Sequence, residues 1–124
     1  MLFKIARSSL GGWMVGWMME HLSNLLPVDR LFETPRLVAF RHPRPAYSIH
    51  ILIVPKKAVH NLMDLESVGD DFASLFMADL LACVRKIVAD FDLEQSGYRL
   101  IVNGGGYQDV PELHFHLVSG SALG

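Results

Sequence analysis

The sequence predicts an α+β domain in which one long helix covers an antiparallel β-sheet. Apolar residues repeat at helical spacing over residues 72–91, which form the clearest helix in the chain. Runs typical of strands lie both before and after this helix. The 124 residues contain no internal repeat, low-complexity tract or linker, so we expect one domain with a sizeable core.

The first 26 residues are predicted to form an amphipathic helical extension that precedes the domain of residues 27–124. Apolar side chains and one histidine recur there at amphipathic-helix spacing: Met14, Trp17, Met18, His21, Leu22 and Leu25. There are two alternatives for this helix. It packs on its own domain or on a dimer mate, which is the alternative that we favour, or it lies on a membrane surface.

Neither a transmembrane span nor a signal peptide is expected near the N-terminus. The uncharged residues 8–19 would cover about 18 Å as a helix, less than the roughly 30 Å hydrocarbon core of a bilayer. No cleavage site of the A-x-A type follows them. The net charge of −2 gives no pull toward nucleic acid, and the single Cys83 excludes an internal disulfide. These features favour a cytoplasmic protein.

Two strands are predicted in the first half of the domain. Residues 37–40 form a short one, and a proline-stiffened loop over residues 41–46 follows. Residues 48–54 form a central strand, because both of its faces are apolar apart from His50. A histidine in such a strand is either a satisfied core residue or part of a site, and by itself we interpret His50 as core.

The long helix is followed by a strand and a glycine-rich loop. Ser67 and Asp70 are placed as a capping pair ahead of the helix. Gly97 then turns the chain into a strand over residues 98–102. The loop of residues 103–107 contains three glycines, which expose backbone N–H groups as an anion-binding loop requires, although a tight hairpin would use the same residues.

Residues 112–118 alternate between two faces, which predicts a half-buried strand. The apolar parity would face the core, whereas Glu112, His114 and His116 would stand in a row on the other face. At the rise of a strand, the two imidazoles are rooted about 6.6 Å apart, close enough to engage one phosphate. Histidine can be a nucleophile, a proton donor or a metal ligand, so this row is the candidate site.

Taken in order, these segments resemble the histidine-triad (HIT) superfamily of nucleotide hydrolases and transferases, and most closely its branch of small nucleoside phosphoramidases. The likeness covers roughly residues 30–120. It rests on the motifs at residues 37–40, 50–57, 97–103, 108–110 and 114–120. The resemblance implies homodimers whose sheets join into one of ten strands, hence about five strands in each protomer. It also implies a bound nucleotide, with a purine mononucleotide expected, and no metal or other cofactor.

The resemblance assigns the chemistry to three histidines. His114 would attack the α-phosphorus of the nucleotide, His116 would donate a hydrogen bond to the phosphate, and His50 would be a further active-site histidine. As a nucleophile, His114 needs its lone pair on the correct nitrogen, which a bond from the other N–H to a backbone carbonyl would secure. The implied substrate-binding positions serve the nucleoside, the ribose and the phosphate: Phe40, His42, Asn103, Gly105, Gln108 and Asp109.

Three departures from the pattern of that branch concern the pocket. Glu112 replaces the first histidine of the triad. It would act either through its side chain, which adds negative charge near an anionic substrate, or mainly through its backbone carbonyl, and it could hold a nearby imidazole protonated. Asp109 stands where the branch commonly has a phosphate-binding serine, and His42 where an acidic residue contacts the ribose. The loop of residues 103–108 is also shorter.

The leading hypothesis is a hydrolase that cleaves the α-phosphorus bond of nucleoside phosphoramidates or related phosphoanhydrides through a nucleotidyl-His114 intermediate. A nucleotidyltransferase would use the same adduct. A second class is a catalytically weak protein that binds nucleotides without turning them over. In a third, His114 and His116 bind a metal ion together with Glu112 or His50.

Overall fold

A computed structural model of the chain describes residues 30–123. Its strands are β1 (Arg30–Glu33), β2 (Leu37–Arg41), β3 (Tyr47–Pro55), β4 (Arg99–Val102) and β5 (Phe115–Ala122). Its helices are the 3₁₀ turns η1 (Leu62–Val68) and η2 (Gly105–Tyr107) and the α-helices α2 (Phe72–Asp90) and α3 (Leu93–Ser96). The helix predicted over residues 1–26 lies outside the described residues. Within the described ones, no helix is long and apolar enough to cross a membrane.

The five strands form one antiparallel sheet in the order β1-β2-β3-β5-β4. This confirms the predicted α+β class. The strand β1 was not predicted from its own residues, because its four positions are too few to show a period. The central β3 is paired on both sides, by β2 and by β5.

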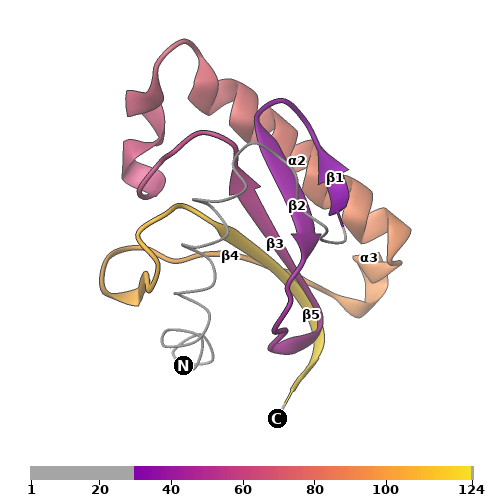
Figure 1. The fold of residues 1–124 in the computed structure, drawn as a ribbon. Helices are drawn as coiled ribbons and strands as arrows, with labels where there is room; N and C mark the ends of the chain where they lie inside the picture. The colour runs from indigo at the N-terminus through magenta and orange to yellow at the C-terminus, as the bar shows by residue number, and fades with distance from the viewer. Residues whose placement is uncertain (1–29, 124) are drawn as a thin grey trace.

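The helix α2 lies across one face of the sheet and builds the main core there (Figure 1). Its buried residues Phe76 and Ile87 join Ile53 and Leu117 of the sheet in one hydrophobic cluster. Burying a side chain of this size stabilises the fold by about 1.5–3 kcal/mol. The alternate residues of the same strands, such as Leu52 and His116, point to the opposite face, so this is the face available for chemistry.

The predicted capping pair of the long helix is wrong. Ser67 belongs to η1, where its hydroxyl donates to the Asp64 carbonyl at 2.6 Å. The residue that precedes α2 is Asp71, whose φ is +59°, and it makes no side-chain cap. Asp70 and Gly69 also have positive φ, so the chain reverses direction here through backbone geometry instead of a capping box.

The predicted strand at residues 112–118 is shifted along the chain. β5 starts at Phe115 and continues to Ala122, so Glu112 precedes the strand and does not stand in a row with His116. The reason is a tertiary contact: the Leu113 N–H donates to the Val59 carbonyl at 2.8 Å, which holds this segment against the loop after β3. His114 is therefore the last residue of this loop segment.

Candidate functional site

Four histidines are buried together on the sheet face opposite α2, and we call them the histidine cluster: His42, His50, His114 and His116. Adjacent ring centroids lie 4.4 Å apart for His42 and His50, 5.1 Å for His50 and His116, and 5.0 Å for His116 and His114. The sheet register explains this proximity. β3 and β5 pair His50 with Val118 and Leu52 with His116, while the His42 N–H donates to the His50 carbonyl at 2.9 Å.

Hydrogen bonds fix the tautomers of His50 and His116. The Ala46 N–H donates to Nδ1 of His50 at 2.9 Å, so a neutral His50 carries its proton on Nε2. That Nε2 lies 2.9 Å from Nδ1 of His116 and donates to it. His116 therefore carries its own proton on Nε2 and can donate it to a substrate. One backbone amide thus sets the direction of a chain of two imidazoles.

The ring of His114 is oriented by the backbone of the same segment. Its Nδ1–H donates to the Glu112 carbonyl at 2.7 Å, because a carbonyl oxygen can only accept. In the neutral ring the lone pair is then on Nε2. This arrangement is the one that a histidine nucleophile requires. The residue as a whole is 8% exposed.

The cluster is neutral near pH 7. Burial lowers the pKa of His42 to about 3, that of His50 to about 4 and that of His116 to about 2. Each protonated neighbour would add to this effect for His42 and His116. Burial also lowers the pKa of His114, although its bond to the Glu112 carbonyl and the charge of Asp109 partly oppose the shift. All four rings therefore keep a lone pair.

The side chain of Glu112 points away from the row that was predicted for it. One of its carboxylate oxygens lies 4.0 Å from Nδ1 of His60, an exposed residue of the loop after β3. The same Nδ1 donates to the Pro111 carbonyl at 3.1 Å. Of the two ways in which Glu112 could act, the geometry supports the backbone carbonyl, which holds His114.

Gln108 links the same two loops. Its amide nitrogen donates to the carbonyls of His60, at 2.7 Å, and Val110, at 3.0 Å. With the bond from Leu113 to Val59, these contacts fix the segment that carries the Glu112 carbonyl. Both amide N–H groups of Gln108 are used in this way, so its expected contact with phosphate would have to come from its backbone or after a rearrangement.

The other predicted binding residues come from β2 and from the segment between β4 and β5. Phe40 lies in the same row as His116, through the pairs Phe40–Leu52 and Leu52–His116, and it is fully buried. Asn103 follows β4 directly, and Gly105 lies in η2 with φ of +57°. Asp109 is half-buried and close enough to His114 to raise its pKa. Their roles toward a ligand stay predictions.

The metal-binding alternative finds no support in this arrangement. Among residues 30–123, no three His, Cys, Asp or Glu side chains are placed to hold a metal ion. The Nδ1 atoms of His50, His114 and His116 are all engaged in the hydrogen bonds given above.

Three contributors to the site were missed from the sequence. The Ala46 N–H acts through the backbone, so no side-chain pattern could reveal it. Tyr47 packs edge-on against His50 at 6.1 Å, and His60 approaches Glu112 across two loops. Their effects depend on tertiary contacts between distant segments. The proline-stiffened loop before Tyr47 was the one available signal, since such a loop can return the chain toward the next strand.

Comparisons with known proteins agree with this fold. The family model described as "HIT domain" matches residues 25–123. An "uncharacterized HIT-like protein" of Chlamydia trachomatis is 37% identical over 98 residues, which cover 77% of this chain and 84% of that protein.

Two solved structures have similar folds. A HIT family hydrolase from Legionella pneumophila gives a TM-score of 0.66 at 33% identity, over 83% of this chain and 90% of the other. A histidine triad nucleotide-binding protein from Candida albicans gives 0.67 at 25% identity, over 90% and 79% of the two chains.

Proposed function

Because this chain belongs to the HIT domain family, we propose that it is a nucleotide-binding hydrolase that uses His114 as a covalent nucleophile. The substrate class is a nucleoside phosphoramidate or a related phosphoanhydride. The observation that carries this proposal is the His114 ring itself, whose Nδ1–H is bound to the Glu112 carbonyl at 2.7 Å. Its Nε2 is then the basic nitrogen.

The reaction has two displacements at the α-phosphorus. In the first, Nε2 of His114 forms a bond to phosphorus while the bond to the leaving nitrogen or oxygen breaks, and the leaving group takes a proton from water. In the second, a water oxygen attacks phosphorus, the bond to Nε2 breaks and the water proton returns to solvent. The products are a nucleoside monophosphate and a free amine or phosphate. Splitting one difficult step in this way suits an imidazole.

The remaining histidines supply positioning and charge stabilisation, which phosphoryl-type transfer mostly requires. His116 donates from Nε2 to a phosphate oxygen, and His50 holds it in that tautomer through the 2.9 Å bond between them. The backbone N–H groups around Gly105 and the Asn103 amide are further donors. Phe40 and His42 lie on the β2 side of the cluster, where the resemblance implies the nucleoside and its ribose.

The narrower assignments draw on the resemblance and on the similar proteins. The Candida protein is described as nucleotide-binding and the Legionella protein as a hydrolase. We further propose a purine mononucleotide, a cytoplasmic location and a homodimer. The strand β4 is an edge of the sheet, and Leu100 on it is 42% exposed, as expected for a strand that pairs with a second copy. Residues 1–26 would form the helical extension of the domain of residues 27–124.

A substrate panel with adduct trapping tests the function. The purified full-length protein is mixed with adenosine and guanosine phosphoramidates and with dinucleoside polyphosphates, then quenched within one turnover. We expect release of the nucleoside monophosphate and a protein mass increased by one nucleotidyl group on the peptide that contains His114. Turnover without any such adduct would contradict the covalent mechanism. Added acceptor alcohols or phosphates would reveal a transferase by capturing the nucleotidyl group.

A second candidate is a nucleotide-binding protein with little turnover. Asp109 favours it, because its negative charge lies near His114, where an anionic substrate would bind. Calorimetry that shows binding of AMP by the wild-type protein, together with no product across the panel, would support this candidate over the hydrolase.

Replacing Glu112 with glutamine tests how this residue acts. Because its backbone carbonyl holds His114, we expect the kcat of Glu112→Gln to stay within about threefold of wild type, which corresponds to less than about 0.7 kcal/mol. KM should fall or stay the same, since a negative charge is removed near an anionic substrate. Steady-state kinetics measures both. A loss of kcat beyond about tenfold would show that the carboxylate itself takes part.

A further inference from the structure

The segment that carries the Glu112 carbonyl lies outside the sheet. β5 begins at Phe115, and its pairs with β3 and β4 start at that residue. The carbonyl that orients His114 is therefore held by tertiary contacts instead of by the hydrogen bonds of a strand. A displacement of about 1 Å at a reacting group can cost about a hundredfold in rate. The residues that hold this segment thus bear on the reaction.

Two successive carbonyls of the loop after β3 accept hydrogen bonds from this segment. The Leu113 N–H donates to the Val59 carbonyl at 2.8 Å, and the Gln108 side-chain amide donates to the His60 carbonyl at 2.7 Å. Leu113 and Val59 are both buried. The segment is thus attached to the loop at two points, one before Glu112 and one after it.

The side chain of Gln108 also binds the backbone of its own segment. Its amide nitrogen donates to the Val110 carbonyl at 3.0 Å. The amide oxygen could not take this place, because both partners of the amide are carbonyl oxygens, which only accept. One half-buried side chain therefore joins the loop after β3 to the backbone two residues before Glu112.

We propose that Gln108 is a positioning residue for the nucleophile, because its side-chain amide holds the segment whose Glu112 carbonyl orients His114. This inference rests on the proposed function, and it gives Gln108 a role within the protein in place of the phosphate contact that the resemblance implies. Without the amide, the carbonyls of His60 and Val110 lose their donor, so the segment has to move to reach water. The Glu112 carbonyl then no longer fixes the His114 ring.

Replacing Gln108 with methionine tests the positioning role. Methionine has a similar length, carries no N–H group and adds no charge near the substrate. In the full-length protein, Gln108→Met should lower kcat for a nucleoside phosphoramidate about tenfold to a hundredfold, the upper value being the cost of a displacement of about 1 Å. The Kd for AMP, measured by calorimetry, should stay within about threefold of wild type, because the amide binds the protein and not the phosphate.

The ring of His114 provides a measurement that requires no turnover. In the wild-type protein, nitrogen NMR of the imidazole should show one neutral tautomer with its proton on Nδ1, as the bond to the Glu112 carbonyl requires. In Gln108→Met the tautomer with its proton on Nε2 should appear as well, because the carbonyl no longer holds the Nδ1–H. Gln108→Asn keeps the amide but shortens its reach, so it should give the same changes to a smaller extent.

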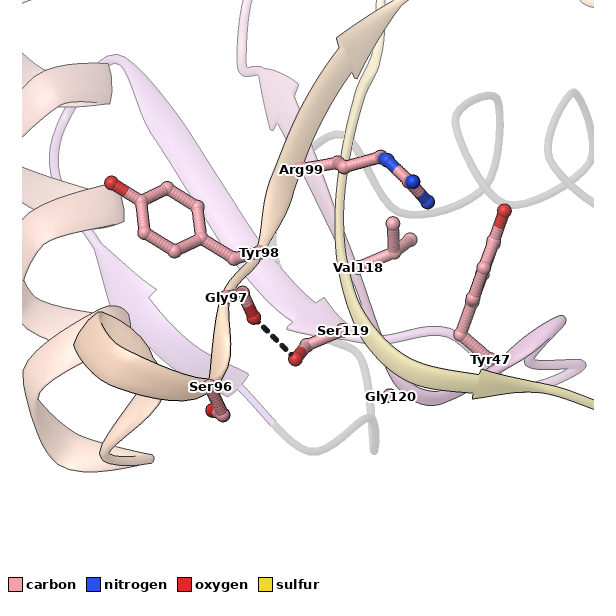
Figure 2. Close-up of a pocket in the computed structure, with 8 residues that line it drawn as sticks. All are labelled: Tyr47, Ser96, Gly97, Tyr98, Arg99, Val118, Ser119 and Gly120. Carbon is pink, nitrogen blue, oxygen red and sulfur yellow. Dashed lines mark hydrogen bonds between the residues drawn. The ribbon is translucent and has the colours of Figure 1, made fainter.

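The matched control lies at the other end of β4. Gln95 of α3 is exposed and precedes Ser96, which lines a cavity of about 310 Å³ beside the start of β4 (Figure 2). The eight described residues that line this cavity include none of the histidine cluster. Gln95→Met should therefore keep the wild-type kcat, the wild-type Kd for AMP and the wild-type tautomer of His114.

The results separate this role from the proposed function. An unchanged His114 tautomer in Gln108→Met would overturn the positioning role, whatever happens to kcat. A Kd for AMP that rises about tenfold or more would then identify the amide as a phosphate ligand. If the wild-type protein turns over no substrate, the proposed function falls, while the comparison of the His114 tautomer in wild type and Gln108→Met still decides whether Gln108 positions the ring.

Discussion

His114→Ala is expected to lose about 10⁴-fold or more of the wild-type kcat and to form no nucleotidyl adduct. The variant removes the attacking atom itself, and loss of a nucleophile typically costs enzymes this much or more. Its fold should survive, because the substitution removes one hydrogen bond to the Glu112 carbonyl and adds no volume. Losing such a bond costs about 0.5–1.5 kcal/mol. Single-turnover mixing with a nucleoside phosphoramidate and mass spectrometry of the quenched protein measure the two effects.

Another histidine of the same region provides the matched control. His60 is exposed and lies outside the histidine cluster, although its Nδ1 donates to the Pro111 carbonyl. His60→Ala should reduce kcat by less than about tenfold, because the side-chain amide of Gln108 and the backbone N–H of Leu113 still donate to backbone carbonyls and hold the segment. Undiminished release of AMP by His114→Ala would show that another group, or water directly, attacks the phosphorus.

The regular elements could be predicted from the sequence because their signals are local. The apolar repeat that predicted α2 and the alternating pattern that predicted β3 each lie within one segment of the chain. Both elements have bounds in the structure that are close to the predicted ones. The strand β1 shows the limit of this reasoning. It has four residues and is defined by its pairing with β2 instead of by its own pattern. The capping pair failed for a related reason, since the turn at Asp70 and Asp71 depends on positive φ angles that a motif does not specify.

The sequence predicted which histidines belong to the site, but it did not predict the hydrogen bonds that hold them in place. His50 looked like a core residue by itself, and the motif order of the whole chain was needed to join it to His114 and His116. Alternation also placed Glu112 in the histidine row, whereas a bond between Leu113 and Val59 keeps it out of the strand. The tautomer of His116 depends on the Ala46 amide through His50. Such contacts join segments that are distant in the sequence, so local patterns cannot contain them.

Mild acid is expected to destabilise the protein strongly, through His42, His50 and His116 of the histidine cluster. In the folded state burial lowers the pKa of His42, His50 and His116 to about 3, 4 and 2, whereas in the unfolded chain they titrate near 6.5. At pH values between the folded and the unfolded pKa of each histidine, the unfolded state therefore binds more protons than the folded state. The stability that these groups contribute is fully present above pH 6.5 and is lost progressively as the pH falls toward about 4 for His50, about 3 for His42 and about 2 for His116. Each group changes the free energy of unfolding by at most about 1.4 kcal/mol per pH unit.

The expected result is a loss of about 4–6 kcal/mol in the free energy of unfolding between pH 7 and pH 5, from three groups over about 1.5 units. Urea denaturation at several pH values measures it. The carboxylates Glu33 and Asp79 have lowered pKa values and would contribute to acid unfolding only near and below pH 4, so this window isolates the histidines. The free energy of unfolding should depend less steeply on pH in the variant His116→Asn, by about 1.4 kcal/mol per pH unit, whatever the stability of the variant at pH 7. A wild-type free energy that stays flat from pH 7 to pH 5 would mean that the rings take up protons in the folded state. His116 would then no longer accept from His50, and the tautomers on which the nucleophile and its phosphate donor depend would be lost.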